Sequence, residues 1–299
     1  MELKLSNANP LKIKTGCLIL PVGHNNKLSG ITEQANAASG KLLGKILKQK
    51  DLADSNGATL MLHEVPSLSA LRVMLVRTGD SNKLTAKQFE RVTAAVASAL
   101  SIPGIKECVS CLNEVEVEDK DQTWQARSFA QALVANTYRF DLHKSKKTAK
   151  STKFDGKATL FVSNRKQNKA IEAGINQGSA IANGMSLARD LGNTAANVCT
   201  PTYLGKQAKA LEKSYSSIKT KLLNEAQMKK LGMGALLSVS AGSAEPAQLI
   251  CMEYKGAAAS KKPVVLVGKG VTFDTGGISI KPSAGMDEMK FDMLSLIHI

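Results

Sequence analysis

Over the first 165 residues, the spacing of apolar and polar residues changes repeatedly between strand and helix periods. Short apolar runs, typical of buried strands, alternate with stretches whose apolar residues recur every three or four positions, as on one face of a helix. The expected strands are 11–13, 17–21, 71–76, 107–112 and 158–163, and the expected helices are 32–50, 85–100 and 125–137. Strands separated by helices predict a mostly parallel, helix-covered sheet. We therefore expect an N-terminal α/β domain over residues 1–165.

A single long helical pattern follows this domain. Apolar and small residues recur at helical spacing from about Gln167 to Leu191, and Gly192-Asn193 ends the run. A helix of this length between two strand-rich regions is typical of a connector. We expect residues 166–192 to form a linker helix.

Strand and helix signals alternate again beyond the linker. Thr200-Pro201 is a cap residue followed by proline at the first helical position, which predicts the start of a helix. Strands are expected at 235–239 and 249–253, and the fully apolar run 263–267 predicts a strand buried on both faces. Residues 193–293 are therefore expected to begin a second α/β domain, which is incomplete.

Composition and charge limit the function classes. The chain has 299 residues, of which 43% are hydrophobic, so wholesale disorder and fibrous structure are excluded. No run approaches the roughly 18 apolar residues that a membrane span needs, and Met1–Ser6 does not resemble a secretory signal. The five cysteines are scattered and odd in number, which indicates a reducing, cytoplasmic compartment.

The net charge of +15 is concentrated in one segment. Residues 143–170 hold nine Lys or Arg residues and one acidic residue, Asp155, and so contribute +8. Such a segment is most often a solvated surface loop. An alternative is a patch for nucleic-acid backbones, centred on Lys146 and Lys147. The chain has only seven Phe, four Tyr and one Trp, so a base-stacking platform is not expected.

The residues that carry chemistry follow the last apolar run directly, from Gly268 to Met293. Ligands of α/β sheets bind beyond the carboxyl ends of strands, and the glycines of this segment allow the backbone to approach a ligand closely. The spacing of Gly268-Lys-Gly does not match a phosphate-binding P-loop. Asp274-Thr-Gly resembles half of an aspartic protease site, but a second copy of this motif is absent, so that alternative requires two chains to pair.

The whole string from Gly268 to Met293 resembles the active-site signature of the leucyl aminopeptidase family, the bacterial cytosol aminopeptidase or aminopeptidase A type. Three upstream stretches resemble the same family: 188–204, 231–234 and 253–256. The match is specific from about residue 170 to 293, whereas the N-terminal domain matches only in architecture. The resemblance implies the N-terminal α/β domain followed by the start of an α/β metallopeptidase domain.

The resemblance also implies roles for four residues. Lys269, Asp274 and Asp292 match metal ligands, and Lys281 matches the catalytic lysine that stabilises the oxyanion. Two divalent metal ions, Mn²⁺ or Zn²⁺, are the implied cofactors, because hard oxygen ligands with one nitrogen suit either ion. An ammonium group cannot coordinate a metal, so Lys269 would have to be neutral. The implied activity is release of N-terminal amino acids, with leucine-type preference, from peptide substrates by a cytoplasmic homohexamer.

The chain departs from the family at its C-terminal end. The second family signature, Asn-Thr-Asp-Ala-Glu-Gly-Arg, is absent, and with it the arginine that would hold a bicarbonate. Residues 294–299, Leu-Ser-Leu-Ile-His-Ile, resemble a translated sequencing adapter, so we expect a C-terminally truncated chain with a non-native tail in which His298 is not a ligand. We expect this chain to bind metals poorly and to be inactive alone.

The remaining candidate residues are expected to have structural or surface roles and not catalytic ones. Asp287 and Glu288 are expected to be loop or supporting residues rather than ligands, and His24 and His63 to be isolated surface or strand-end histidines. Cysteines 108, 111, 199 and 251 are expected to be buried thiols, although Cys108-x-x-Cys111 resembles half a zinc site. The competing hypothesis from another class is a basic DNA-binding accessory or regulatory protein that uses the N-terminal domain and the lysine-rich segment.

Overall fold

The computed structural model describes residues 1–79, 83–145 and 153–293. The chain divides into two compact units, Met1–Ser186 and Leu187–Ile299. The boundary falls inside helix α5 (Asn168–Asn193). The presence of α5 confirms the helix expected from Gln167 to Leu191. Its function as a linker stays a prediction.

A six-stranded sheet organises the first unit, in the order β1-β6-β5-β2-β4-β3. All neighbouring strands are parallel except β3, which runs antiparallel to β4 at one edge. The predicted α/β fold with a mostly parallel sheet is therefore confirmed. The strands are β1 Glu2–Ser6, β2 Cys17–Val22, β3 Thr59–His63, β4 Arg72–Arg77, β5 Glu107–Ser110 and β6 Lys157–Phe161.

Helices cover both faces of this sheet and create two apolar cores. Helices α1 (Gly30–Ala38) and α2 (Leu42–Lys48) pack on one face. The other face carries α3 (Ala86–Ala99), α4 (Gln122–Asn136) and the first half of α5. Successive residues of a strand point to opposite faces, so β2 supplies both cores and is fully buried along most of its length.

Helix α5 approaches α4 so closely that only glycine fits between them. A Cβ atom on Gly178 would lie 2.2 Å from the carbonyl oxygen of Arg127. Side chains of α5 on the same face, Ile171 and Ile175, are buried in the core that α3 and α4 share. The small residues of the helical pattern therefore mark a contact between two helices.

The structure corrects two predictions in the first unit. Residues 11–13 are not a strand, because Asn9 caps a short 3₁₀ helix, η1 (Pro10–Lys12), that begins with proline. The single helix expected at 32–50 is two helices, since the backbone turns left-handed at Gly40 and Lys41 between α1 and α2. Strands β1 and β3 were not predicted from the sequence. Short 3₁₀ helices η2 (His24–Asn26), η3 (Leu112–Glu114) and η4 (Arg165–Gln167) follow β2, β5 and β6.

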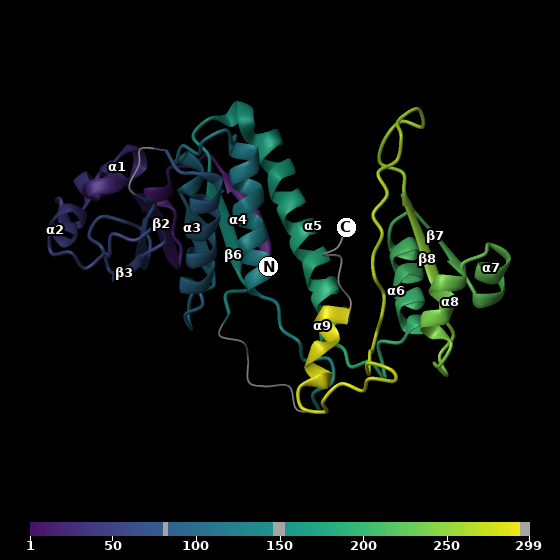
Figure 1. The fold of residues 1–299 in the computed structure, drawn as a ribbon. Helices are drawn as coiled ribbons and strands as arrows, with labels where there is room; N and C mark the ends of the chain where they lie inside the picture. Colours follow the sequence, from purple (N-terminus) through teal and green to yellow (C-terminus); the bar gives the residue numbers. More distant parts are fainter. Residues whose placement is uncertain (80–82, 146–152, 294–299) are drawn as a thin grey trace. The chain divides into compact units, whose positions relative to one another are not determined.

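The second unit contains a small antiparallel pair, β7 (Ile218–Leu223) and β8 (Leu249–Tyr254), against which α6 packs (Figure 1). Helix α6 spans Pro201–Ser214, and Thr200 caps it as predicted. The strand expected at 249–253 is confirmed by β8. The other elements are α7 Glu225–Lys230, α8 Gly234–Ser240, η5 Met286–Met289 and α9 Lys290–Met293.

Two strands predicted for this unit are absent. Residues 235–239 lie in helix α8, because Ala-Leu-Leu-Ser-Val fits a short helix as well as a strand. Residues 263–267 form no strand, and the four apolar side chains from Val264 to Val267 are 69–88% exposed. A strand buried on both faces needs a paired neighbour on each side, and the described part of this unit offers only β7 and β8. No helix in the described ranges is long and apolar enough to cross a membrane.

Candidate active site in the glycine-rich segment

The segment from Gly268 to Met293 folds back on itself around Asp274 and Lys281. The Lys281 ammonium lies 3.2 Å from Asp274 Oδ2, and the Gly276 amide donates to Asp274 Oδ1 at 2.9 Å. The Lys281 amide donates to the Thr275 carbonyl at 2.8 Å, which closes the turn. Gly276 has φ +90°, and a Cβ there would lie 2.2 Å from the Ser279 carbonyl oxygen, so this position requires glycine.

This turn holds Asp274 in its charged form. The pKa of the Asp274 carboxyl is lowered chiefly by the hydrogen bond from the Gly276 amide, then by the hydrogen bond and charge of Lys281. The charge of Lys269 lowers this pKa further and more weakly. The carboxylate is 46% exposed and remains available to an incoming ligand. The arrangement therefore offers an accessible carboxylate beside an ammonium group.

Lys269 lies beside an apolar hollow within the second unit. The cavity has a volume of about 440 Å³ and is lined by α6, α8, β8 and residues 268–273. Its apolar walls include Leu204, Val239 and Ile250. Such a hollow can accept an apolar side chain next to Lys269.

Asp292 does not join the other three residues. It is exposed on the short helix α9 and, within the described ranges, forms no hydrogen bond or ion pair with Lys269, Asp274 or Lys281. The described part of the chain contains no group of three or more His, Cys, Asp or Glu side chains that could hold a metal ion. The described residues thus supply the ionised Asp274 carboxylate, with the Lys281 ammonium beside it. They do not supply a full set of metal ligands.

The other residues considered in the sequence lie apart from this turn. Asp287 and Glu288 belong to η5, and Asp287 lines a cavity of about 520 Å³ with Phe273 and Lys290. Asp274 pairs with a lysine and not with a second carboxylate, which is unlike an aspartic protease dyad. His63 is exposed at the end of β3, and Lys146, Lys147 and Lys150 fall outside the described residues.

The cysteines follow the prediction with one exception. Cys108 and Cys111 are buried, as are Cys17 and Cys199, and burial raises the pKa of each of these thiols, that of Cys17 to about 12. The prediction that Cys251 is buried is wrong. It lies on β8, and its side chain is exposed.

Two family models match this chain. One is the catalytic domain of the cytosol aminopeptidase family, over residues 186–295, and the other is the N-terminal domain of that family, over residues 19–147. The chain belongs to the cytosol aminopeptidase family. The aminopeptidase resemblance seen in the glycine-rich segment is therefore confirmed at the level of the family.

Relatives within the cytosol aminopeptidase family extend beyond the matched region. The chain is 42% identical over 293 residues to a probable cytosol aminopeptidase of Nitrosococcus oceani, covering 98% of this chain and 58% of that protein. It is 41% identical to a cytosol aminopeptidase of Pseudomonas aeruginosa, covering 98% and 59%. The chain thus spans less than two thirds of the length of these relatives.

Solved structures agree in fold. A mutant of tomato leucine aminopeptidase matches with a TM-score of 0.76 at 22% identity, covering 98% of this chain and 56% of that one. The bottromycin maturation enzyme BotP, in complex with Mn, matches with a TM-score of 0.67 at 22% identity, covering 93% and 53%. At this identity the likeness concerns the fold alone.

A titration tests the electrostatic description of Asp274. We expect the carboxyl carbon of Asp274, followed by NMR, to titrate below pH 3.8, because the charged form is stabilised by Gly276 and Lys281. The pair is therefore intact above the ordinary aspartate pKa and is lost as the pH falls through the lowered value. Lys281→Ala should raise the midpoint, though not fully, since the Gly276 amide remains. An unchanged midpoint in Lys281→Ala would show that the ion pair does not form.

Thiol reactivity tests the placement of the cysteines. Under native conditions we expect one fast thiol in the reaction with Ellman's reagent, because Cys251 alone is exposed among the five. Cys251→Ser should remove the fast phase, whereas Cys199→Ser should leave it intact. Two or more fast thiols in the native chain would contradict the buried placement of the others.

Proposed function

We propose that this chain forms part of a metal-dependent aminopeptidase that releases N-terminal amino acids, with leucine-type preference, from peptides. The observation that carries the proposal is the turn that holds the Asp274 carboxylate ionised, with the Lys281 ammonium 3.2 Å away. Membership of the cytosol aminopeptidase family supports it. The complex of BotP with Mn supports metal dependence.

Each residue of the segment has a proposed task. Lys269, Asp274 and Asp292 would hold divalent metal ions, Mn²⁺ or Zn²⁺, which polarise a carbonyl group and lower the pKa of bound water. Asp274 contributes a carboxylate that is charged throughout the neutral range. Lys281 remains an ammonium, binds the carbonyl oxygen of the peptide and stabilises the negative charge that develops on it. The apolar hollow beside Lys269 would receive the side chain of the N-terminal residue.

The proposed site requires ligands from outside the described residues. Asp274 and Asp292 are the carboxylates that the family resemblance assigns to the metals, and the described residues form no group of three or more His, Cys, Asp or Glu side chains that could hold a metal ion. The missing acidic ligands and the arginine for a bicarbonate would come from the further length that the relatives possess. A homohexamer in the cytoplasm completes the proposal. The nucleic-acid hypothesis stays a prediction, since three of its lysines lie outside the described residues.

A chimera tests this function directly. Residues 1–293 would be joined to the remaining C-terminal part of the Nitrosococcus oceani relative, and leucine p-nitroanilide hydrolysis measured with Mn²⁺. We expect turnover that a chelator abolishes. Lys281→Ala should reduce kcat by about 10²–10³-fold, the range for loss of one oxyanion donor, whereas Lys261→Ala, an exposed lysine of the same unit, should not. An active Lys281→Ala chimera would refute the assignment of Lys281.

A further inference from the structure

Another cavity lies in the N-terminal unit, at the carboxyl ends of its parallel strands. Its volume is about 680 Å³. Its lining includes residues that follow five different strands: Asn7 after β1, Gly23 after β2, Thr78 after β4, Glu114 after β5 and Ser163 after β6. All of its lining residues belong to this unit, so the cavity is distinct from the glycine-rich segment.

The topology of the sheet makes this position a place for a ligand. The chain leaves β2 toward α1 on one face, whereas it leaves β4 and β5 toward α3 and α4 on the other face. Neighbouring strands whose connections go to opposite faces leave a crevice beyond their carboxyl ends, and ligands of open α/β sheets bind in such crevices. The cavity occupies this point.

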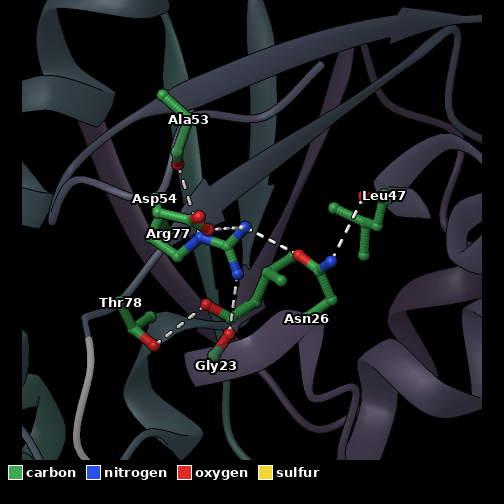
Figure 2. Close-up of polar contacts among 8 residues, drawn as sticks. Gly23, Asn26, Leu47, Ala53, Asp54, Arg77 and Thr78 are labelled. Carbon is green, nitrogen blue, oxygen red and sulfur yellow. Dashed lines mark hydrogen bonds and ion pairs between the residues drawn. The ribbon is translucent and has the colours of Figure 1, made fainter. Parts of the chain in front are cut away.

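A buried arginine holds the rim of the cavity in place. Figure 2 shows the Arg77 guanidinium between the loops that carry Gly23, Asn26 and Ala53. It donates to the Gly23 carbonyl at 2.8 Å and to Asn26 Oδ1 at 2.7 Å. Arg77 is only 2% exposed. Its hydrogen bonds to Gly23 and Asn26 therefore hold the loop between β2 and α1 from the protein interior. The rim is therefore preformed, which lowers the entropic cost of binding a small molecule.

One part of the lining presents donors to a negative group. The first residues of α1, Gly30 and Ile31, line the cavity, and amides at the start of a helix lack acceptors within the helix. Ser29 precedes them, and its hydroxyl makes no capping hydrogen bond to the first turn. His24 and Lys27 line the same cavity. Amides and a hydroxyl at a helix start suit a carboxylate.

Another part of the lining presents acceptors to a positive group. Glu114 and Glu116 are exposed and both line the cavity. Glu114 Oε1 accepts from the Ser163 amide at 3.1 Å, and Glu116 Oε2 lies 3.5 Å from the Lys83 ammonium at the surface. Each carboxylate has two oxygens and about four acceptor positions, so both retain capacity for a further donor. The apolar residues Ile31, Leu84 and Phe161 also line the cavity.

We propose that this cavity binds a free amino acid or short peptide in its zwitterionic form. The ligand's carboxylate lies at the start of α1, its ammonium group at Glu114 and Glu116, and its apolar side chain against Phe161 and its neighbours. A lining with both signs of charge disfavours a ligand that carries only one, because one set of charged groups would be left unpaired. The proposal does not depend on the activity proposed for the glycine-rich segment.

Calorimetry with three related probes tests the charge requirement. The full 299-residue chain would be titrated with L-leucine, with L-leucinamide, which lacks the carboxylate, and with N-acetyl-L-leucine, which lacks the ammonium group. We expect saturable binding of L-leucine and at least about tenfold weaker binding of each analogue, because each loses one charged set of hydrogen bonds. Equal affinity for all three, or absence of saturable leucine binding, would overturn the proposal.

Variants locate the binding. Gln34 is an exposed lining residue of α1, so Gln34→Trp should fill the cavity and abolish leucine binding. The matched control is Gln49→Trp, at an exposed position outside the lining, and it should bind normally. Glu116→Gln should weaken L-leucine by about tenfold while leaving N-acetyl-L-leucine unchanged. Asp274→Asn should have no effect, and leucine binding that is lost in Asp274→Asn but kept in Gln34→Trp would refute the site.

Discussion

The purified chain of 299 residues is expected to release no p-nitroaniline from leucine p-nitroanilide above the buffer rate, with or without Mn²⁺. Catalytic metal sites supply at least three protein ligands to an ion, and the described residues hold no such group of His, Cys, Asp or Glu side chains. Asp274 already pairs with Lys281. Without a complete set of ligands, metal ions should bind weakly and the water and carbonyl should remain unactivated.

The chimera with the remainder of the Nitrosococcus oceani relative is the positive control for this measurement. It contains the same residues 1–293. If the chimera hydrolyses the substrate and the 299-residue chain does not, the chain is inactive because it lacks the ligands that the added part supplies. Turnover by the 299-residue chain that requires Mn²⁺ and stops with a chelator would contradict the prediction. Such a result would mean that the described residues form a metal site on their own.

Elements with local signals were predicted well from the sequence. Helix α3 lies where a helix was expected, at 85–100, and the Thr85 hydroxyl and the Gln88 side chain form a capping box at its start, with each side chain bonded to the other's backbone. At the start of α6, the Thr200 hydroxyl accepts a hydrogen bond from the Tyr203 amide. Such contacts span three residues, so their partners can be read directly from spacing.

Elements that depend on distant partners were predicted poorly. The run 263–267 has the composition of a central strand, yet it is exposed and unpaired because no described strand lies beside it. Strand β1 was missed because its pairing partner, β6, is about 155 residues away. Strand pairing is decided by tertiary contacts, and apolar patterning alone cannot supply them.

The candidate sites follow the same rule. Asp274 and Lys281 lie within one loop of eight residues, so a single sequence motif contains both. The cavity at the carboxyl ends of the strands, in contrast, is lined by residues that follow five strands. The first of these strands ends at residue 6 and the last at residue 161. Individually, Asn7, Thr78 and Ser163 have no distinguishing sequence signal. Only the order of the strands brings them together.

Replacement of Arg77 by methionine is expected to destabilise the N-terminal unit by about 3–4 kcal/mol, because a buried guanidinium and its hydrogen bonds to three acceptors are lost. The guanidinium donates to the carbonyls of Gly23 and Ala53 and to Asn26 Oδ1, and methionine can satisfy none of them. For a unit of this size, the expected fall in Tm is roughly 6–16 °C. Thermal unfolding followed by circular dichroism measures it, and Arg91→Met, at an exposed position on α3, should change stability by no more than about 0.5 kcal/mol.

Asp54→Asn separates the two kinds of contact that Arg77 makes. The Asp54 carboxylate lies 3.1 Å from the guanidinium but is 92% exposed, so removing its charge should cost at most about 1 kcal/mol. We therefore expect the stability of Asp54→Asn to stay close to that of the unmodified chain, with the carbonyls and Asn26 accounting for the Arg77→Met effect. If Asp54→Asn and Arg77→Met lowered Tm equally, the ion pair and not the buried hydrogen bonds would hold the loop between β2 and α1.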